Sequence, residues 1–288
     1  MATDAVSTPT ATPGADARPN RHVRSADGTS IAVFSVGTGP PLVLVHGAAA
    51  DHTTFRVLGP LLEPMFTTHA IDRRGRGASG DTAPYAIERE FEDVAAVAAA
   101  VARDAGGPVD VFGHSYGGRC ALGAALLSPD IRRVISYEGA PTPPGERYGD
   151  EALAAELQAL ADAGRNEALL ERFLTEVVGM TAPELERYRA DPVWPRRVAA
   201  APTIARELAV EAGDAAGLDR LAQVRQPVLQ ILGGDSKREF GAATAALDDR
   251  LADDTIVVIP GAKHAAHHTH PVAVVEAITA FLAEPRQP

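Results

Sequence analysis

The sequence has 288 residues, of which 45% are hydrophobic, so it can bury a substantial core and is not disordered as a whole. Its 27 Lys and Arg against 38 Asp and Glu give a formal net charge of −11, which disfavours binding to nucleic-acid phosphates or anionic membranes. The single cysteine, Cys120, excludes an intrachain disulfide and a thiolate zinc site.

Residues 1–20 lack the basic start and the apolar stretch of a secretory signal, and we expect them to form a disordered tail. The most apolar helical run, residues 94–102, is far shorter than the roughly 20 residues that a membrane helix needs. We therefore expect a cytoplasmic protein, monomeric or homodimeric, with a small-molecule partner and neither nucleic acid nor membrane.

Short apolar segments bounded by turn residues predict strands throughout the ordered chain. The expected strands are 22–24, 31–35, 42–45, 67–71, 109–112, 134–137, 228–232 and 255–259. Helical patterns lie between them, at 53–62, 87–103, 116–127, 238–251 and 272–282. This alternation is typical of crossover connections and predicts an α/β fold with a mostly parallel sheet.

One long segment interrupts the alternation. Residues 141–221 contain no strand pattern and five helical ones, at 151–163, 167–178, 182–190, 194–200 and 203–211. No Gly- or Ser-rich linker flanks them. We expect a helical cap over 141–221, inserted into a core made of residues 21–140 and 222–288.

Residues 113–118 read Gly-His-Ser-Tyr-Gly-Gly and follow the predicted strand 109–112. A G-x-S-x-G pattern between a strand and a helix is typical of a nucleophile elbow, whose serine sits on a sharp, strained turn. Its neighbours two positions away must be small, and Gly113 and Gly117 meet that need. Ser115 is therefore the candidate nucleophile, and the alternative is an ordinary glycine-rich turn.

The small-residue loop 46–50 follows the predicted strand 42–45. Acyl transfer needs two N–H donors for the oxyanion. One donor comes from the residue after the nucleophile, Tyr116, and the other from the loop after an early strand, where Ala48 is the candidate. The alternative for this loop is a simple turn that ends the strand.

A base is expected late in the chain, where residues 263–271 hold four histidines. His264 follows the predicted strand 255–259 and a short loop. It therefore lies at the carboxyl edge of the sheet, where the candidate nucleophile also lies. A metal cluster of His264, His267 and His268 is a weaker alternative, because no acidic ligand lies nearby in the sequence.

Two carboxylates compete to orient the base. Glu138 follows the predicted strand 134–137, and Asp235 follows the predicted strand 228–232. An acid at the end of a buried strand costs desolvation energy unless it has a partner, and the imidazole would provide one for Glu138. Asp235 is alternatively an N-cap for the helix that begins near Lys237.

The His-Gly of the 46–50 loop, the segment 72–79 (DRRGRGAS), the elbow and His264 together resemble enzymes of the α/β-hydrolase-fold superfamily, over about residues 21–283. The resemblance implies a mostly parallel central sheet flanked by helices, with a helical cap insertion. It also implies a serine hydrolase that needs neither a metal nor an organic cofactor.

Many members of this superfamily carry the acid in a G-x-x-D pattern after the strand before the last one. Here the fourth place, counted from Gly233, is Ser236, and Asp235 comes one residue early. Some haloalkane dehalogenases and macrocyclic-lactone hydrolases instead place the acid after the strand that follows the elbow, and Glu138 matches that position. The resemblance thus favours Ser115, His264 and Glu138 as the triad. Dehalogenase activity does not carry over, because that reaction uses a carboxylate nucleophile.

These residues predict an esterase or lactonase acting on a small to medium apolar substrate through an acyl-enzyme. Cleavage of a carbon–carbon bond or a thioester by the same triad is the alternative reaction. A ligand-binding protein without turnover is the alternative of a different class.

Several other side chains have open roles. Four aromatic and Met residues of the cap have two possible roles, which are to line a substrate pocket or to form the cap's own core. They are Phe173, Met180, Tyr188 and Trp194. Asp51 and His52 contact either substrate or solvent. The basic residues of the 72–79 segment match the superfamily's loop pattern and need not bind an anion; they are Arg73, Arg74 and Arg76.

Overall fold

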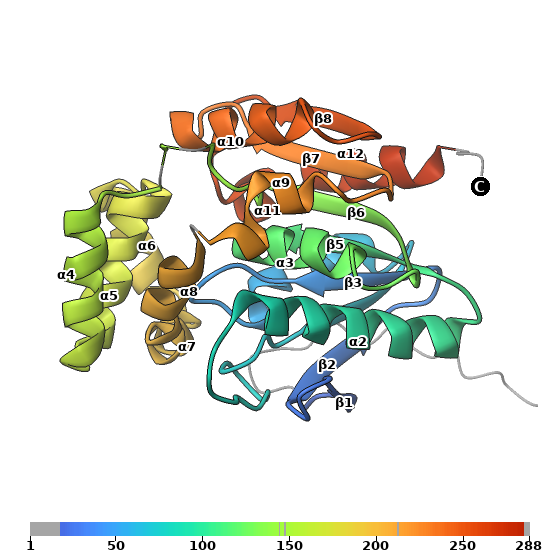
Figure 1. The fold of residues 1–288 in the computed structure, drawn as a ribbon, viewed down its shortest axis with the longest axis horizontal. Helices are drawn as coiled ribbons and strands as arrows, with labels where there is room; N and C mark the ends of the chain where they lie inside the picture. Colours follow the sequence, from blue (N-terminus) through green and yellow to red (C-terminus); the bar gives the residue numbers. More distant parts are fainter. Residues whose placement is uncertain (1–17, 144, 147, 212, 285–288) are drawn as a thin grey trace, which may run out of the picture.

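The computed structural model describes residues 18–143, 145–146, 148–211 and 213–284, so the predicted tail over 1–20 lies almost entirely outside the described residues. In this part of the chain eight strands form one sheet in the order β1-β2-β4-β3-β5-β6-β7-β8 (Figure 1). Their bounds are β1 Arg21–Arg24, β2 Ser30–Val36, β3 Pro41–Val45, β4 Thr67–Ile71, β5 Val109–His114, β6 Ile131–Tyr137, β7 Val228–Gly233 and β8 Asp254–Ile259. Strand β2 pairs antiparallel with β1 and β4, and the remaining pairs are parallel. The predicted fold class is confirmed.

Strand β3 shows why the apolar runs form buried strands. Successive side chains of a strand point to opposite faces of the sheet. Leu42 and Leu44 join one hydrophobic cluster, and Val43 and Val45 join the other. Both faces of the strand are thus covered, which is why its sequence shows no polar alternation.

Helices cover both faces of the sheet. The face with Val43 and Val45 is covered by α2 (Ile87–Ala105), α3 (Tyr116–Ala125), α9 (Leu218–Leu221) and α10 (Arg238–Asp248). The face with Leu42 and Leu44 is covered by η1 (His52–Arg56), α1 (Gly59–Leu62), α11 (Ala266–Thr269) and α12 (Pro271–Ala283). The predicted helix 53–62 is therefore two short helices.

A group of helices lies between β6 and β7 in the chain and beside one end of the sheet, at the left of Figure 1. It consists of α4 (Glu151–Asp162), α5 (Asn166–Arg172), the π-helix η2 (Phe173–Val178), α6 (Ala182–Arg189), α7 (Trp194–Ala200) and α8 (Thr203–Glu211). We call these helices the cap. They share a hydrophobic cluster of their own, which includes Leu157, Leu170 and Trp194. The short helix η3 (Asp214–Ala216) and α9 instead contribute to a cluster of the sheet core. The division into core and cap domains stays a prediction.

A buried ion pair fastens the cap to the core. Asp51, in the loop after β3, accepts hydrogen bonds from Arg197 Nη1 at 2.7 Å and from Arg196 Nε at 2.5 Å, both on α7. Burial opposes ionisation of Asp51, but the Arg197 charge and the hydrogen bond from Thr53 outweigh it and hold the pKa of Asp51 below its usual range. Asp51 therefore contacts the cap rather than solvent.

His52 and the neighbouring arginines also have structural partners. His52 is buried, and its Nδ1 lies 2.8 Å from Asp72 Oδ1. Arg74 forms two hydrogen bonds of 2.7 Å with Asp93 on α2. The arginines of the 72–79 segment are thus paired inside the protein.

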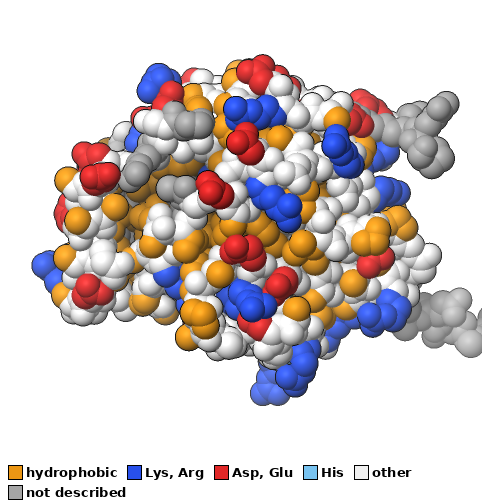
Figure 2. Space-filling model, viewed as in Figure 1, with side chains coloured by type: hydrophobic (Ala, Val, Ile, Leu, Met, Phe, Trp, Pro, Cys, Tyr) orange, Lys and Arg blue, Asp and Glu red, His pale blue; other side chains and the backbone are white. Residues whose placement is uncertain are grey.

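The outer surface is mixed in charge. Figure 2 shows acidic and basic side chains scattered over one face, with hydrophobic side chains between the cap and the core. Within the described ranges, no helix combines the length and the apolar character required to cross a membrane.

We predict that Asp51→Ala lowers the midpoint of thermal unfolding by several degrees. The change leaves the Arg197 guanidinium, which is 1% exposed, without its charge partner, at a cost of about 3 kcal/mol. Calorimetry would measure the shift. Glu156→Ala is the matched control, because its pair with Arg172 is exposed and worth at most about 1 kcal/mol. Equal shifts in the two variants would contradict the proposed anchor.

Candidate active site

Ser115 occupies a sharp turn between β5 and α3. Its backbone has φ 55° and ψ −128°, a conformation that non-glycine residues rarely adopt. A Cβ on Gly113 would lie 2.3 Å from the carbonyl oxygen of Gly117, and one on Gly117 would lie 2.3 Å from that of Val45. The two glycines are therefore required by close backbone contacts, as the elbow motif predicts.

His264 and Glu138 come together beside this turn. Glu138 directly follows β6, and His264 lies in the loop after β8. The Nδ1 of His264 is 2.5 Å from Glu138 Oε2, and both side chains are buried. Glu138 also has a positive φ of 48°, so strained backbone aims the carboxylate as well as the serine.

The other oxygen of Glu138 is held by the loop after β7. Oε1 accepts a hydrogen bond of 2.7 Å from the Gly233 N–H and one of 2.6 Å from Ser236 Oγ. Ser236 stands where the G-x-x-D pattern has its acid. A hydroxyl at that position thus supports a carboxylate that comes from the neighbouring strand.

Asp235 takes no part in this arrangement. Its side chain is exposed, and its backbone N–H bonds the carbonyl oxygen of Ala262 at 2.8 Å. The N-cap residue of α10 is Lys237, so the alternative role of Asp235 as a helix cap is wrong.

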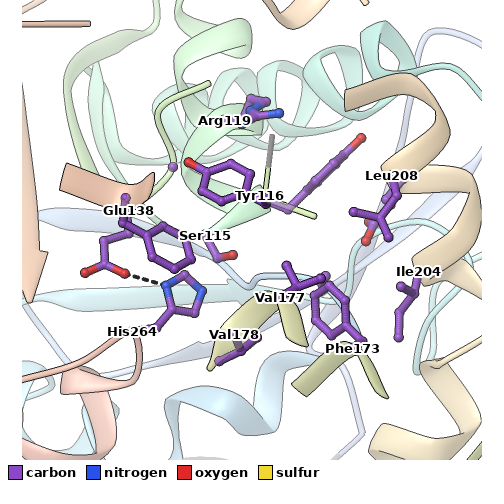
Figure 3. A pocket seen from close by; sticks show the side chains of 15 residues that line it. Ser115, Tyr116, Arg119, Glu138, Phe173, Val177, Val178, Ile204, Leu208 and His264 are labelled. Atoms are coloured by element: carbon purple, nitrogen blue, oxygen red, sulfur yellow. Dashed lines mark hydrogen bonds and ion pairs between the residues drawn. The ribbon is translucent and has the colours of Figure 1, made fainter. Parts of the chain in front are cut away.

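Ser115 and His264 line the same cavity, and Figure 3 shows the serine beside the imidazole ring, with Glu138 on the ring's other side. Among the described residues, no hydrogen bond joins the Ser115 hydroxyl to His264. Such contacts are often long in unliganded enzymes and tighten when substrate binds.

The loop that carries His264 is fixed on several sides. The Tyr137 hydroxyl donates to the Lys263 carbonyl oxygen and accepts a hydrogen bond of 2.8 Å from the Ala266 N–H. His114 Nε2 lies 2.8 Å from the His264 carbonyl oxygen. The Phe240 ring stacks on the imidazole at a centroid distance of 4.3 Å. No local sequence motif marks these positioning residues, so they are not predictable from the sequence alone.

The candidate oxyanion donors lie at the same cavity. Ala48 and Tyr116 line it with Ser115, and neither of their N–H groups forms a hydrogen bond within the described chain. The loop of Ala48 is held from behind by Arg73, whose N–H bonds His46 Nε2 at 3.0 Å and whose Nη1 bonds the Gly47 carbonyl oxygen at 3.1 Å. Two backbone N–H groups without a partner in the described chain thus belong to residues that line the cavity with the candidate nucleophile.

Within the described part of the chain, His264, His267 and His268 do not have the mutual spacing of metal ligands. Among the described residues, one group has the spacing of metal ligands, namely Asp51, His52 and Asp72, and its Asp51 is bound by two arginines. Burial, aided by neighbouring positive charges, lowers the pKa of His267 well below its usual value and that of His268 to about 3. These two imidazoles are neutral near pH 7.

Two hollows meet at Ser115 and His264. The smaller cavity has a volume of about 40 Å³, with walls that include Phe173, Val177 and Ile204 of the cap. The larger pocket has a volume of about 560 Å³. Phe173 lines both spaces, and Met180 and Tyr188 line the larger one. Trp194 belongs to the cap's own cluster, where its Nε1 donates to Glu167.

Comparisons with known proteins agree with this architecture. The sequence profile of the Alpha/beta hydrolase family matches residues 42–277. The chain is 29% identical to 2-(acetamidomethylene)succinate hydrolase of Mesorhizobium japonicum, over 85% of this chain and 89% of that protein. It is 31% identical to pimeloyl-[acyl-carrier protein] methyl ester esterase of Xanthomonas campestris, over 86% and 97% respectively.

A solved structure is similar as well. The crystal structure of an alpha/beta hydrolase from Sphaerobacter thermophilus superposes with a TM-score of 0.78 and 33% identity, over 91% of this chain and all of that one. The family profile, the sequence relatives and the fold agree, and the chain belongs to the alpha/beta hydrolase family.

Proposed function

We propose that this protein is a serine hydrolase that cleaves a carboxylic ester or lactone through an acyl-enzyme intermediate. The observation that carries the proposal is the 2.5 Å contact between His264 Nδ1 and Glu138 Oε2, beside a serine on a strained turn. This contact fixes the tautomer of the imidazole, so that its Nε2 is the nitrogen that can accept a proton.

The reaction proceeds in two stages. Ser115 Oγ attacks the acyl carbon while His264 Nε2 takes the hydroxyl proton, and the Ala48 and Tyr116 N–H groups bind the oxyanion. The imidazolium then protonates the leaving alcohol. In the second stage His264 takes a proton from water, which attacks the acyl-enzyme, and Ser115 regains its proton as the acid leaves. The Glu138 carboxylate stabilises the imidazolium in both stages.

The walls of the two hollows support a small to medium substrate with apolar parts. The reacting centre is bordered by Phe173 and Val178 of the cap and by Ala48 of the loop after β3. The relative named as a methyl ester esterase supports an ester as the bond that is cleaved.

Cleavage of another bond by the same residues is the second candidate, as a carbon–carbon hydrolase or a thioesterase. It is favoured by the 29% identical relative that is named for a succinate derivative rather than for an ester. Product analysis over esters, lactones, thioesters and a diketone separates these reactions.

We predict that Ser115→Ala reduces the hydrolysis of p-nitrophenyl acetate by about 10⁴-fold or more, because the nucleophile is lost. A spectrophotometric assay would measure the rate. In parallel, an organophosphate should add its mass to Ser115 of the natural protein and not to the variant. A fully active variant would contradict the proposal, and tight ester binding without turnover in the natural protein would indicate a non-catalytic role.

We predict that Glu138→Gln lowers kcat by about 10²–10⁴-fold, because an amide at this position presents a donor to Nδ1 and removes the charge that stabilises the imidazolium. Asp235→Asn is the matched control, since this exposed side chain is on the adjacent loop, and it should keep kcat within about twofold. Steady-state kinetics at fixed pH would decide. A large loss in the Asp235 variant alone would show that the acid is assigned wrongly.

A further inference from the structure

A second carboxylate lies in the wall of the small cavity. Glu207, on cap helix α8, is 1% exposed and lines the space that also contains Ser115 and His264. Its Oε1 accepts hydrogen bonds from Arg73 and Arg76, so the guanidinium groups of the core hold this oxygen in place. The sequence gives no sign of this carboxylate, because it lies inside an ordinary amphipathic helix.

The second oxygen of Glu207 is different. Oε2 is buried and has no hydrogen-bond partner among the described residues. Two hydroxyls at this cavity already have partners, because Tyr116 Oη lies 3.0 Å from Tyr85 Oη and Tyr148 Oη donates to the Ala140 carbonyl oxygen at 2.7 Å. A buried acceptor without a donor is costly, so this oxygen has a binding capacity that the protein itself leaves unused.

The charges around Glu207 indicate what kind of group it binds. Arg73 and Arg76 are balanced by Glu90 and Glu207, so this buried cluster is neutral as a whole. A cation therefore gains little from entering the cavity. A carboxylate oxygen accepts only, so the complementary group is a neutral donor such as a hydroxyl.

The size of the space restricts the ligand further. A volume of about 40 Å³ is enough for a few water molecules or a short chain, but not for an aromatic ring. A large leaving group would fit only the pocket of about 560 Å³, and this placement would leave the small cavity to a short acyl chain.

We propose that Glu207 selects substrates whose short acyl chain carries a hydroxyl group, which donates to Glu207 Oε2. The inference rests on the proposed serine-hydrolase function and deepens it. In the complex, the substrate hydroxyl supplies the hydrogen bond that Oε2 lacks within the described part of the protein.

The first test uses the natural protein and two chromogenic esters, p-nitrophenyl butanoate and p-nitrophenyl 3-hydroxybutanoate. The ratio of their kcat/KM values is divided by the ratio of their rates of alkaline hydrolysis, which removes the intrinsic reactivity. We expect the hydroxylated ester to be favoured by about tenfold or more, since a hydrogen bond to a charged acceptor is gained. No preference, or a preference for the butanoate, would overturn the inference.

The second test is Glu207→Gln. The two arginine donors keep the amide oxygen on their side, so the NH₂ group turns toward the cavity and the charged acceptor is lost. We expect the preference for the hydroxylated ester, after correction for intrinsic reactivity, to fall by about tenfold. A purely structural role, acting through Arg73 on the oxyanion loop, would slow both esters equally and leave the ratio unchanged, which would also overturn the inference.

Ile204→Val is the matched control, because Ile204 lines the same cavity from the same helix and has no polar atom in its side chain. It should change both rates in parallel and keep the preference. Loss of the preference in this variant as well would show that cavity shape, not Glu207, selects the substrate. Failure of the underlying function has a separate signature, because then neither ester would be cleaved and Ser115 would not be labelled by an organophosphate.

Discussion

The hydrogen bond between Glu138 and His264 joins two loops that leave the sheet at β6 and β8. A carboxylate is stable in a buried place only when its oxygens are satisfied, and here Gly233 and Ser236 bind the oxygen that His264 does not contact. The loops after three adjacent strands are therefore held together by one side chain. The position of the proposed base relative to Ser115 depends on that arrangement.

Buried charge pairs also hold the cap against the core. Arg73 contacts the loop after β3 through the Gly47 carbonyl oxygen and the cap through Glu207. Asp51, at the end of the same loop, binds Arg197 of α7. Two independent buried contacts thus link the cap to the loop that is proposed to bind the oxyanion. A shift of the cap would therefore act directly on that loop.

Most of the fold was predictable because its signals are local. The apolar run at 42–45 and the strand–serine–helix pattern at Ser115 require only sequence neighbours, and both have the expected structure. The expectation that Glu138, rather than Asp235, meets His264 depended on family resemblance and a desolvation argument, and the structure brings these two residues together.

Contacts between distant residues were not predictable in this way. Tyr137 holds the His264 loop across 126 positions of sequence, and Glu207 reaches Arg73 across 134. Nothing in the sequence near either residue indicates its partner. Phe173 lines the cavity, whereas Trp194 packs within the cap. The sequence alone does not distinguish these two roles, because both are aromatic residues on amphipathic segments, and only the packing of the cap helices separates them.

Ser236 supports the carboxylate from the position at which the G-x-x-D pattern has its own acid. The Glu138 carboxylate, after β6, binds the imidazole with one oxygen, and the Ser236 hydroxyl, after β7, donates to the other oxygen. A lineage with acids on both sides would have kept a working imidazole while either acid was lost. In such a lineage the acid could move from one strand to the other without an inactive intermediate.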